Sequence, residues 1–291
     1  MTSVRAEVGI SGFADMTFVL SDGAAENESQ IENKFSTIAE LNVITKIDNQ
    51  LSARLDLDLN TGGQGDSGQL EQAYFIWTSS KDIQFKGGVF NNHLGWEAED
   101  APSMYQITHG QLYDIWNIQT SLRGNNVTGI AISGYVDKAR LMGAFLNDLQ
   151  DTNEENSIEF VVNIYPNQFL DIEAGVVTQE TGAETIIDGS VTYKKGQITA
   201  GVELMQCSKV IDFAQSATLN YEFNKDMNGT VRFDSVNYED EQIEETTSLT
   251  FAIGYRFHKN LSVNGEIRIN NDDNNADNDG NIIRAEVVAT F

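Results

Sequence analysis

The sequence predicts an all-β fold, a transmembrane antiparallel β-barrel of about 16 strands, and three observations lead to it. Apolar and polar residues alternate with a period of two along much of the chain. The connections alternate between short turns and longer polar segments. No apolar run approaches the ~18 residues that a membrane-spanning helix needs, whereas barrel strands turn only every second residue toward lipid.

The alternation is clearest at the C-terminus. Between residues 283 and 291 the apolar positions are Ile283, Ala285, Val287, Ala289 and Phe291, and the same period runs through 261–270, 249–257 and 51–60. Successive side chains of a strand point to opposite faces, so each segment is a strand with one apolar and one polar face. Pro102 and Pro166 are expected outside the strands, because proline cannot donate to a ladder.

The connections predict which rim of the barrel is which. Short turns are expected at about 48–50, 79–82, 137–139, 165–168, 194–197, 224–227 and 258–260, and longer polar segments at 22–33, 62–68, 91–125, 147–156, 238–246 and 271–280. Bacterial membrane barrels have an even number of strands, short periplasmic turns and long extracellular loops. A soluble secreted β-sandwich, the alternative fold, has no reason for this alternation.

Charged and aromatic residues are distributed unequally between the two predicted rims. Most lysines lie in or beside the short turns: Lys46, Lys81, Lys138, Lys194, Lys195, Lys225 and Lys259. An aromatic band lies beside the same turns: Trp77, Phe85, Tyr135, Phe169, Tyr193, Phe223, Phe257 and Phe291. The longest loops carry acid clusters instead, as in 26–32, 154–155 and 239–245. Aromatic side chains at one level are typical of a membrane interface.

The composition excludes several classes of function. The net charge is −26, from 44 acidic and 18 basic side chains, which argues against nucleic acid as a partner. Cys207 is the one cysteine, so an internal disulfide is excluded. No secretory signal peptide precedes the first strand pattern, and we expect the chain to be a mature form of a bacterial outer-membrane protein.

Part of the chain resembles the OmpL-like outer-membrane β-barrel porins. The matching residues are Ala73-Tyr74, Gly87-Gly88-Val89-Phe90, Leu94-Gly95, Glu97, Tyr105 and Thr128-Gly129. Gly88 stands where that family more often has a basic residue. The terminal Phe291 also resembles the end of bacterial outer-membrane barrels, which implies recognition by their assembly machinery. The resemblance implies a porin and leaves its solute open.

The polar face carries the candidate functional residues. Six arginines fall on it: Arg5, Arg54, Arg232, Arg256, Arg268 and Arg284. Their strands become neighbours when the last strand pairs with the first, so they form a basic wall that stays charged at any relevant pH. The longest connection, 91–125, is expected to fold into the lumen of a single barrel domain spanning 1–291. This loop carries the acidic candidates Glu97, Glu99, Asp100 and Asp114.

Two interpretations of these charges stay open. In the first, the basic wall and the loop acids face each other across a constriction, and their transverse field orients zwitterionic solutes. In the second, each arginine pairs with a lumenal acid. The available acids are Glu7, Asp56, Asp234, Glu266 and Glu286.

Metal and catalytic sites find little support. Asn275, Asp277 and Asp279, followed by Glu286, fit a loosened calcium-loop pattern, but strands flank it where helices should. A solvated loop is the favoured interpretation, and neither a metal nor a cofactor is predicted. The three histidines are scattered and no G-x-S-x-G motif accompanies them, so the chain is not predicted to be an enzyme.

The expected function is that of a porin, a water-filled channel for passive diffusion of small hydrophilic solutes or ions. Barrels of this strand number leave an aqueous channel. The expected partners are outer-membrane lipid, lipopolysaccharide and the solutes, with a homotrimer expected by analogy with porins of this size. The alternative is a barrel plugged by its long loop that acts as an adhesin or structural anchor.

Overall fold

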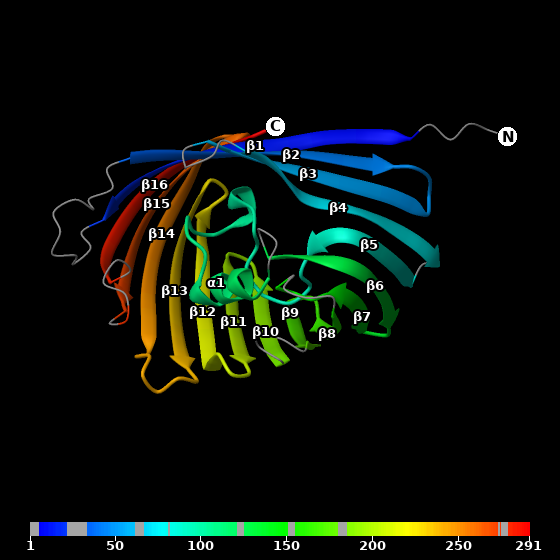
Figure 1. Ribbon diagram of the computed structural model, residues 1–291. Coiled ribbons are helices and arrows are strands. Elements are labelled where there is room, and N and C mark those ends of the chain that lie inside the picture. The colour runs from blue at the N-terminus through cyan, green and yellow to red at the C-terminus, as the bar shows by residue number, and fades with distance from the viewer. Residues whose placement is uncertain are drawn as a thin grey trace.

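The protein is a closed antiparallel β-barrel, seen in a computed structural model (Figure 1). The structure describes residues 6–21, 34–61, 67–80, 82–120, 125–150, 155–179, 185–272, 274 and 279–291. Sixteen strands follow one another around the ring in chain order, and β1 pairs with β16 to close it. The predicted fold class and strand number are therefore confirmed.

The strands are β1 (Glu7–Ser21), β2 (Lys34–Lys46), β3 (Leu51–Thr61), β4 (Ser67–Ser80), β5 (Ile83–Asn91), β6 (Asn126–Val136), β7 (Ala139–Asn147), β8 (Asn156–Asn167), β9 (Leu170–Thr178), β10 (Thr185–Lys195), β11 (Ile198–Cys207), β12 (Ile211–Asn224), β13 (Met227–Tyr238), β14 (Thr246–His258), β15 (Leu261–Asn271) and β16 (Gly280–Thr290). Two helices interrupt the sequence of strands between β5 and β6. They are the 3-10 helix η1 (Ala101–Ser103) and the α-helix α1 (Gln111–Gln119).

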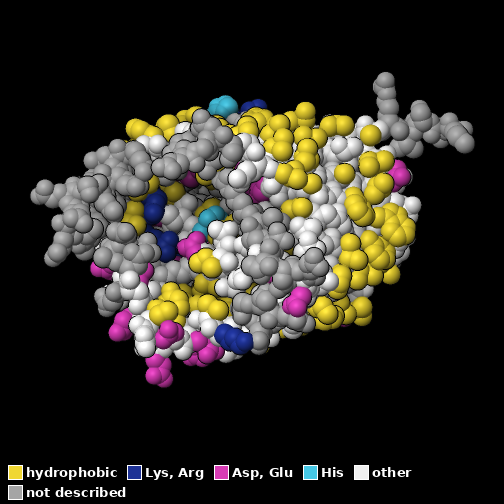
Figure 2. Space-filling view, in the orientation of Figure 1, with side chains coloured by type: hydrophobic (Ala, Val, Ile, Leu, Met, Phe, Trp, Pro, Cys, Tyr) yellow, Lys and Arg dark blue, Asp and Glu magenta, His cyan; other side chains and the backbone are white. Residues whose placement is uncertain are grey.

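The outer wall of the barrel is apolar. Ile130 pairs with Phe145 between β6 and β7, and these large side chains are 62% and 51% exposed on the outside. The next pair in the register, Ala131 and Ala144, is buried on the inner side. The period of two thus turns apolar side chains away from the lumen. In Figure 2 hydrophobic side chains cover much of the visible outer wall, and charged side chains are seen in the hollow.

The connections largely follow the predicted alternation. The turns at the Lys225 rim are short, and the connection between β5 and β6 is long. One connection at the opposite rim is an exception, because residues 208–210 alone join β11 to β12. Pro166 also differs from the prediction, since it lies inside β8. The pairing with β9 is irregular between Ile164 and Asn167, so the proline removes no regular ladder bond there.

The connection between β5 and β6 lies inside the ring. Figure 1 shows α1 within the barrel, away from both rims. We call the described parts of this connection, residues 92–120 and Asn125, the inner loop. In the described part of the chain, no helix is long and apolar enough to span a membrane.

Candidate functional site

The inner loop divides the lumen unequally. On one side it leaves a cavity of about 410 Å³ against the inner wall of β1 to β4 and β16. Seven carboxyl side chains line this space, which we call the acidic cavity: Asp15, Glu40, Asp58, Glu71, Glu99, Asp100 and Glu286. Among the described residues around it, Arg284 and His109 are the basic groups. Carboxyl groups therefore dominate the lining of this cavity.

Two further cavities adjoin the acidic cavity. Toward the short turns a cavity of about 470 Å³ is lined by Lys225, Arg256 and Lys259, and it shares Ala101 and Met104 of the inner loop with the acidic cavity. Toward the other rim a cavity of about 270 Å³ shares Arg284 with it. The three spaces form a row that passes beside the inner loop from one rim toward the other.

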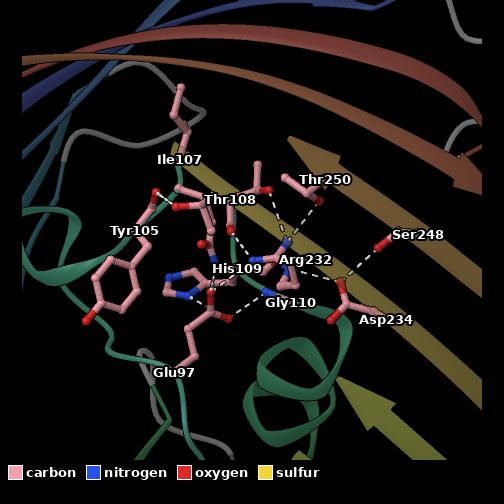
Figure 3. Close-up of polar contacts among 12 residues, drawn as sticks. Glu97, Tyr105, Ile107, Thr108, His109, Gly110, Arg232, Asp234, Ser248 and Thr250 are labelled. Carbon is pink, nitrogen blue, oxygen red and sulfur yellow. Dashed lines mark hydrogen bonds and ion pairs between the residues drawn. The ribbon is translucent and has the colours of Figure 1, made fainter. Parts of the chain in front are cut away.

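Arg232 on β13 anchors the inner loop to the wall (Figure 3). Its Nη1 donates to Glu97 Oε1 at 3.0 Å and to the Thr108 carbonyl at 2.7 Å, and its Nη2 donates to the His109 carbonyl at 2.8 Å. Its Nε donates to Asp234 Oδ2 at 2.9 Å. The side chain is only 1% exposed, so Arg232 holds the loop and leaves no charge facing the open path.

Glu97 is the loop's partner in this anchor. It accepts hydrogen bonds from the Gly110 N–H and from Gln106 Nε2, both at 2.6 Å, in addition to the ion pair with Arg232. Burial by itself would raise the pKa of Glu97, but Arg232, His109 and the Gly110 N–H outweigh it and lower that pKa to about 2. Glu97 is therefore ionised at neutral pH and fixes the start of α1.

Glu266 on β15 is a second anchor. Its carboxylate accepts the N–H groups of Ile107 and Thr108 at 2.8 and 2.9 Å and the Thr108 hydroxyl at 2.7 Å. Arg268 adds a bond from its Nη1 to the His109 carbonyl at 3.0 Å. Buried backbone groups need such partners, because the segment has no ladder of its own.

An apolar contact holds the other side of the loop. Leu112, Ile115 and Trp116 of α1 are buried against the inner wall. The wall residues in this cluster are Phe90, Val127, Ala131, Met142, Ala144, Leu146, Val161, Val177, Ile186, Met205, Cys207, Ile211, Ala214 and Val236. They come from β5 to β13, so the lumen around α1 is packed as a protein core. A cavity of about 340 Å³ remains on this side, between the start of the inner loop and β9 to β11.

Two glycines of the wall make room for loop side chains. A Cβ at Gly201 of β11 would lie 2.2 Å from the Trp96 ring, and one at Gly175 of β9 would lie 2.5 Å from Leu94. Trp96 also donates its indole N–H to Thr192 Oγ1 at 2.7 Å. Glycine at these positions lets the loop approach the wall closely.

The base of the loop is held by a polar chain. His93 Nδ1 lies 2.9 Å from Glu159 Oε2, and His93 Nε2 lies 3.2 Å from Lys86 Nζ. Burial lowers the pKa of His93, although Glu159 opposes that change. A neutral imidazole fits this geometry, because one nitrogen then donates to the carboxylate and the other accepts from the ammonium.

The predicted arginines have different surroundings. Arg54 pairs with Asp56 at 2.6 Å, and Arg284 pairs with Glu266 at 3.4 Å. Arg256 is half exposed at the short-turn rim, where it contacts the Lys225 carbonyl and lies 3.6 Å from Asp226. Arg5 lies outside the described residues. Arg268 and Arg284 line the cavity toward the long-loop rim, whereas Arg256 lines the cavity toward the short turns.

The predicted acids of the loop are also separated. Glu97 is bound to Arg232, whereas Glu99 and Asp100 line the acidic cavity. Burial, and after it the neighbouring Glu71, raises the pKa of Glu99. Asp114 lines the cavity toward the long-loop rim together with Arg268 and Arg284.

Of the weak metal candidates, Asn275 and Asp277 lie outside the described residues. Asp279 accepts the Asp272 N–H at 3.2 Å, which is a loop-stabilising bond.

Four acids of the cavity were missed in the sequence. Asp15, Glu40, Asp58 and Glu71 come from β1, β2, β3 and β4. The signal was an acid at an inward position on four consecutive strands, such as Asp58 between Leu57 and Leu59. It was indistinct because most inward positions of a barrel are polar.

Comparisons with known proteins agree with the architecture. No model of a known protein family matches the sequence, and no curated protein matches it. A variant of the porin of Rh. blastica superimposes with a TM-score of 0.68 at 14% sequence identity, over 98% of this chain and 100% of that chain. A chain from work on the asymmetric conductivity of engineered proteins superimposes with a TM-score of 0.67 at 16% sequence identity, over 98% of this chain and 100% of that chain. A triple variant of the Rhodopseudomonas blastica porin gives 0.64 at 16% identity, again over 98% and 100%. At sequence identities this low, the superpositions show that the fold is shared and nothing finer.

Proposed function

We propose that the chain is a porin of the bacterial outer membrane, a water-filled channel for passive diffusion of small hydrophilic solutes and ions. One observation carries the proposal, the row of cavities that passes beside the inner loop from the short-turn rim toward the other rim. Barrels of this strand number leave room for such a path. The structural likeness to the Rh. blastica porin supports the same function.

The outer surface supports a membrane location. Large apolar side chains such as Ile10, Ile130 and Phe160 are more than half exposed, an arrangement that would be unfavourable in water. The apolar wall suits the hydrocarbon core, and the lysines of the short turns suit the phosphate level of the periplasmic leaflet. Outer-membrane lipid and lipopolysaccharide are the proposed surroundings, and a homotrimer is the proposed assembly. The finer relationship to OmpL-like porins belongs to this proposal.

The proposed channel prefers cations over anions. Its middle part is the acidic cavity, in which carboxyl groups of the wall and of the loop line the same space. Rings of acidic side chains select cations. Arg284 lines this part of the path and Arg268 lines the adjoining cavity, so the transverse field proposed here runs from these arginines toward Glu40, Asp58 and Glu71.

Conductance of the refolded protein in a planar bilayer tests the function. We expect steady single-channel openings and, under a salt gradient, a reversal potential of the sign that cation preference requires. Silence from protein shown to be folded and inserted would instead favour the plugged barrel. Reversing the charges of Arg268 and Arg284 tests the field, because unchanged ion selectivity would contradict it.

A further inference from the structure

We propose that the acidic cavity contains a Ca²⁺ site formed by Glu40, Glu71 and Asp100, and that Ca²⁺ bound there reduces the monovalent current. The binding site stands by itself, whereas its effect on the current rests on the proposed channel function. The site would join the wall of the barrel to the inner loop, in the middle of the three cavities that form the path.

The three carboxyl groups converge from separate parts of the chain. Glu40 lies on β2, Glu71 on β4 and Asp100 on the inner loop just before η1. One carboxylate oxygen of each lies within 4.8 Å of those of the other two. The strand pairing fixes Glu40 and Glu71, and the anchored loop fixes Asp100, so the convergence does not depend on a flexible tail.

Two of the three carboxyl groups carry a buried oxygen for which the described residues supply no hydrogen-bond donor. Glu40 and Glu71 are only 3% and 5% exposed. Within the described part of the chain, Glu40 Oε1 and Glu71 Oε2 are buried and have no hydrogen-bond partner. A buried carboxylate oxygen without a donor or a cation carries a large desolvation cost.

The charged groups around these oxygens make a cation the fitting partner. Asp100 and Glu71 are the charged groups that act most strongly on Glu40, and all three are carboxyl groups. Arg54 is already engaged with Asp56, at 2.6 Å. A divalent cation would therefore supply the positive charge that the wall itself does not bring to this point.

The ligand chemistry favours Ca²⁺ over Mg²⁺. Calcium takes six to eight oxygen ligands at about 2.3–2.6 Å in a flexible geometry, and three carboxylate oxygens within 4.8 Å of one another can close on such an ion. Magnesium requires near-octahedral geometry at about 2.0–2.1 Å and usually keeps several waters, so a set of three protein carboxylates suits it less well. Three carboxylates can bind in monodentate or bidentate fashion and leave positions for water, as calcium tolerates.

Terbium luminescence of the folded, detergent-solubilised barrel tests the site without any ion flow. Tb³⁺ replaces Ca²⁺ among oxygen ligands, and Tyr113, which lines the same cavity, can sensitise its emission. We expect Tb³⁺ emission that Ca²⁺ displaces, with a Ca²⁺ affinity in the ~0.1–1 mM range of extracellular sites. Mg²⁺ should displace it less well.

Charge-matched variants locate the site. Glu40→Gln and Asp100→Asn each remove one ligand charge and should weaken Ca²⁺ binding at least about tenfold. Asp15→Asn removes one charge from the same cavity, outside the proposed ligands, and should leave the affinity nearly unchanged. Asp100→Asn changes the loop alone, so it also serves if Glu40→Gln fails to fold. Equal weakening by all three variants, or no Tb³⁺ emission at all, would overturn the site.

Bilayer recordings test the second part of the proposal. Millimolar Ca²⁺ should reduce the K⁺ current of the wild type, and this reduction should be lost in Glu40→Gln and kept in Asp15→Asn. If Ca²⁺ displaces Tb³⁺ but leaves the current unchanged, the proposed effect on conduction is wrong. If Tb³⁺ binds and the barrel is silent, the site stands and the proposed channel function fails.

Discussion

The two sides of the inner loop differ in the side chains that they contact, apolar on one side and acidic on the other. Toward β5 to β13 helix α1 of the loop is packed like a protein core, with Leu112, Ile115 and Trp116 buried against apolar wall residues. Toward β1 to β4 and β16 it faces a cavity lined by seven carboxyl groups. Apolar burial is favourable without direction, whereas like charges repel and retain water. The difference explains why the loop lies to one side and the path runs along the other.

The polar anchors lie between the two sides. Arg232 on β13 and Glu266 on β15 bind residues 107–109 of the loop, where the apolar cluster ends and the acidic cavity begins. They fix the position of the loop along the wall, and the apolar cluster packs α1 against it. Substitutions on each side should therefore have separable effects on loop stability and on ion selectivity.

Removing the Arg232 anchor should have the largest effect. Arg232→Met leaves Glu97 and Asp234 buried without their cation, and breaking such a pair costs about 3–5 kcal/mol. We expect the loop to detach and the conductance to rise or become noisy. Amide hydrogen exchange at Ile107, Thr108 and Gly110 measures the detachment, because their N–H groups are bound to Glu266 and Glu97.

The matched control is Arg256→Met at the short-turn rim, where the guanidinium is half exposed. Its effect on exchange in the loop should stay within about 0.5 kcal/mol. Similar protection in both variants would show that Arg232 does not hold the loop.

A cavity on the apolar side should have the next largest effect. Leu112→Ala removes a side chain that is 1% exposed, and such truncations cost about 2–5 kcal/mol. We expect faster proteolysis within the loop and little change in the reversal potential, since no charge is altered. The control is Ile118→Ala on the same helix, whose side chain is 70% exposed. A larger effect from Ile118→Ala would contradict the packing described for α1.

Adding a methyl group at a glycine of the wall should have a moderate effect on the packing of the loop. Gly201→Ala places a methyl group against the Trp96 ring, and overpacking of this kind costs about 1–3 kcal/mol. Tryptophan emission should shift to longer wavelength as Trp96 moves toward water. Gly189→Ala on the neighbouring strand is the control, because its Cβ would have no neighbour closer than 3.4 Å. An unshifted spectrum in Gly201→Ala would argue against the close approach.

Lowering the pH from 7 to 4 should have the smallest effect on the stability of the loop. The pKa of Glu97 is about 2 in the folded protein, below its ordinary value of 4.5, so its contribution to stability is complete above about pH 4.5 and is lost as the pH falls through 2. Between pH 7 and pH 4 the loss should be less than about 1 kcal/mol. Hydrogen exchange at Gly110 should follow this curve in the wild type and be flatter in Glu97→Gln. A wild type whose Gly110 exchange shows no such dependence would contradict the pairing with Arg232.

The sequence by itself determined the barrel. A period of two, short turns beside lysines and aromatics, and proline kept from regular ladder positions are local properties, and local properties specify strands, faces and turns. Strand number followed from counting these units, and closure followed because an apolar outer wall leaves no other place for two free edges. Pro166 and the short connection at 208–210 differed by a few residues, since strand ends depend on pairing with the neighbour.

Only the tertiary structure decided how the lumen is used. Arg232 and Arg256 both fall on the polar face that the alternation predicts to point inward. Arg232 is nevertheless buried in the loop anchor, whereas Arg256 is half exposed at the short-turn rim. Glu40, Glu71 and Asp100 are far apart along the chain, and their meeting depends on the barrel register and on the docked loop together. Alternation tells which side chains face inward, but it contains no information on which of them the loop will cover.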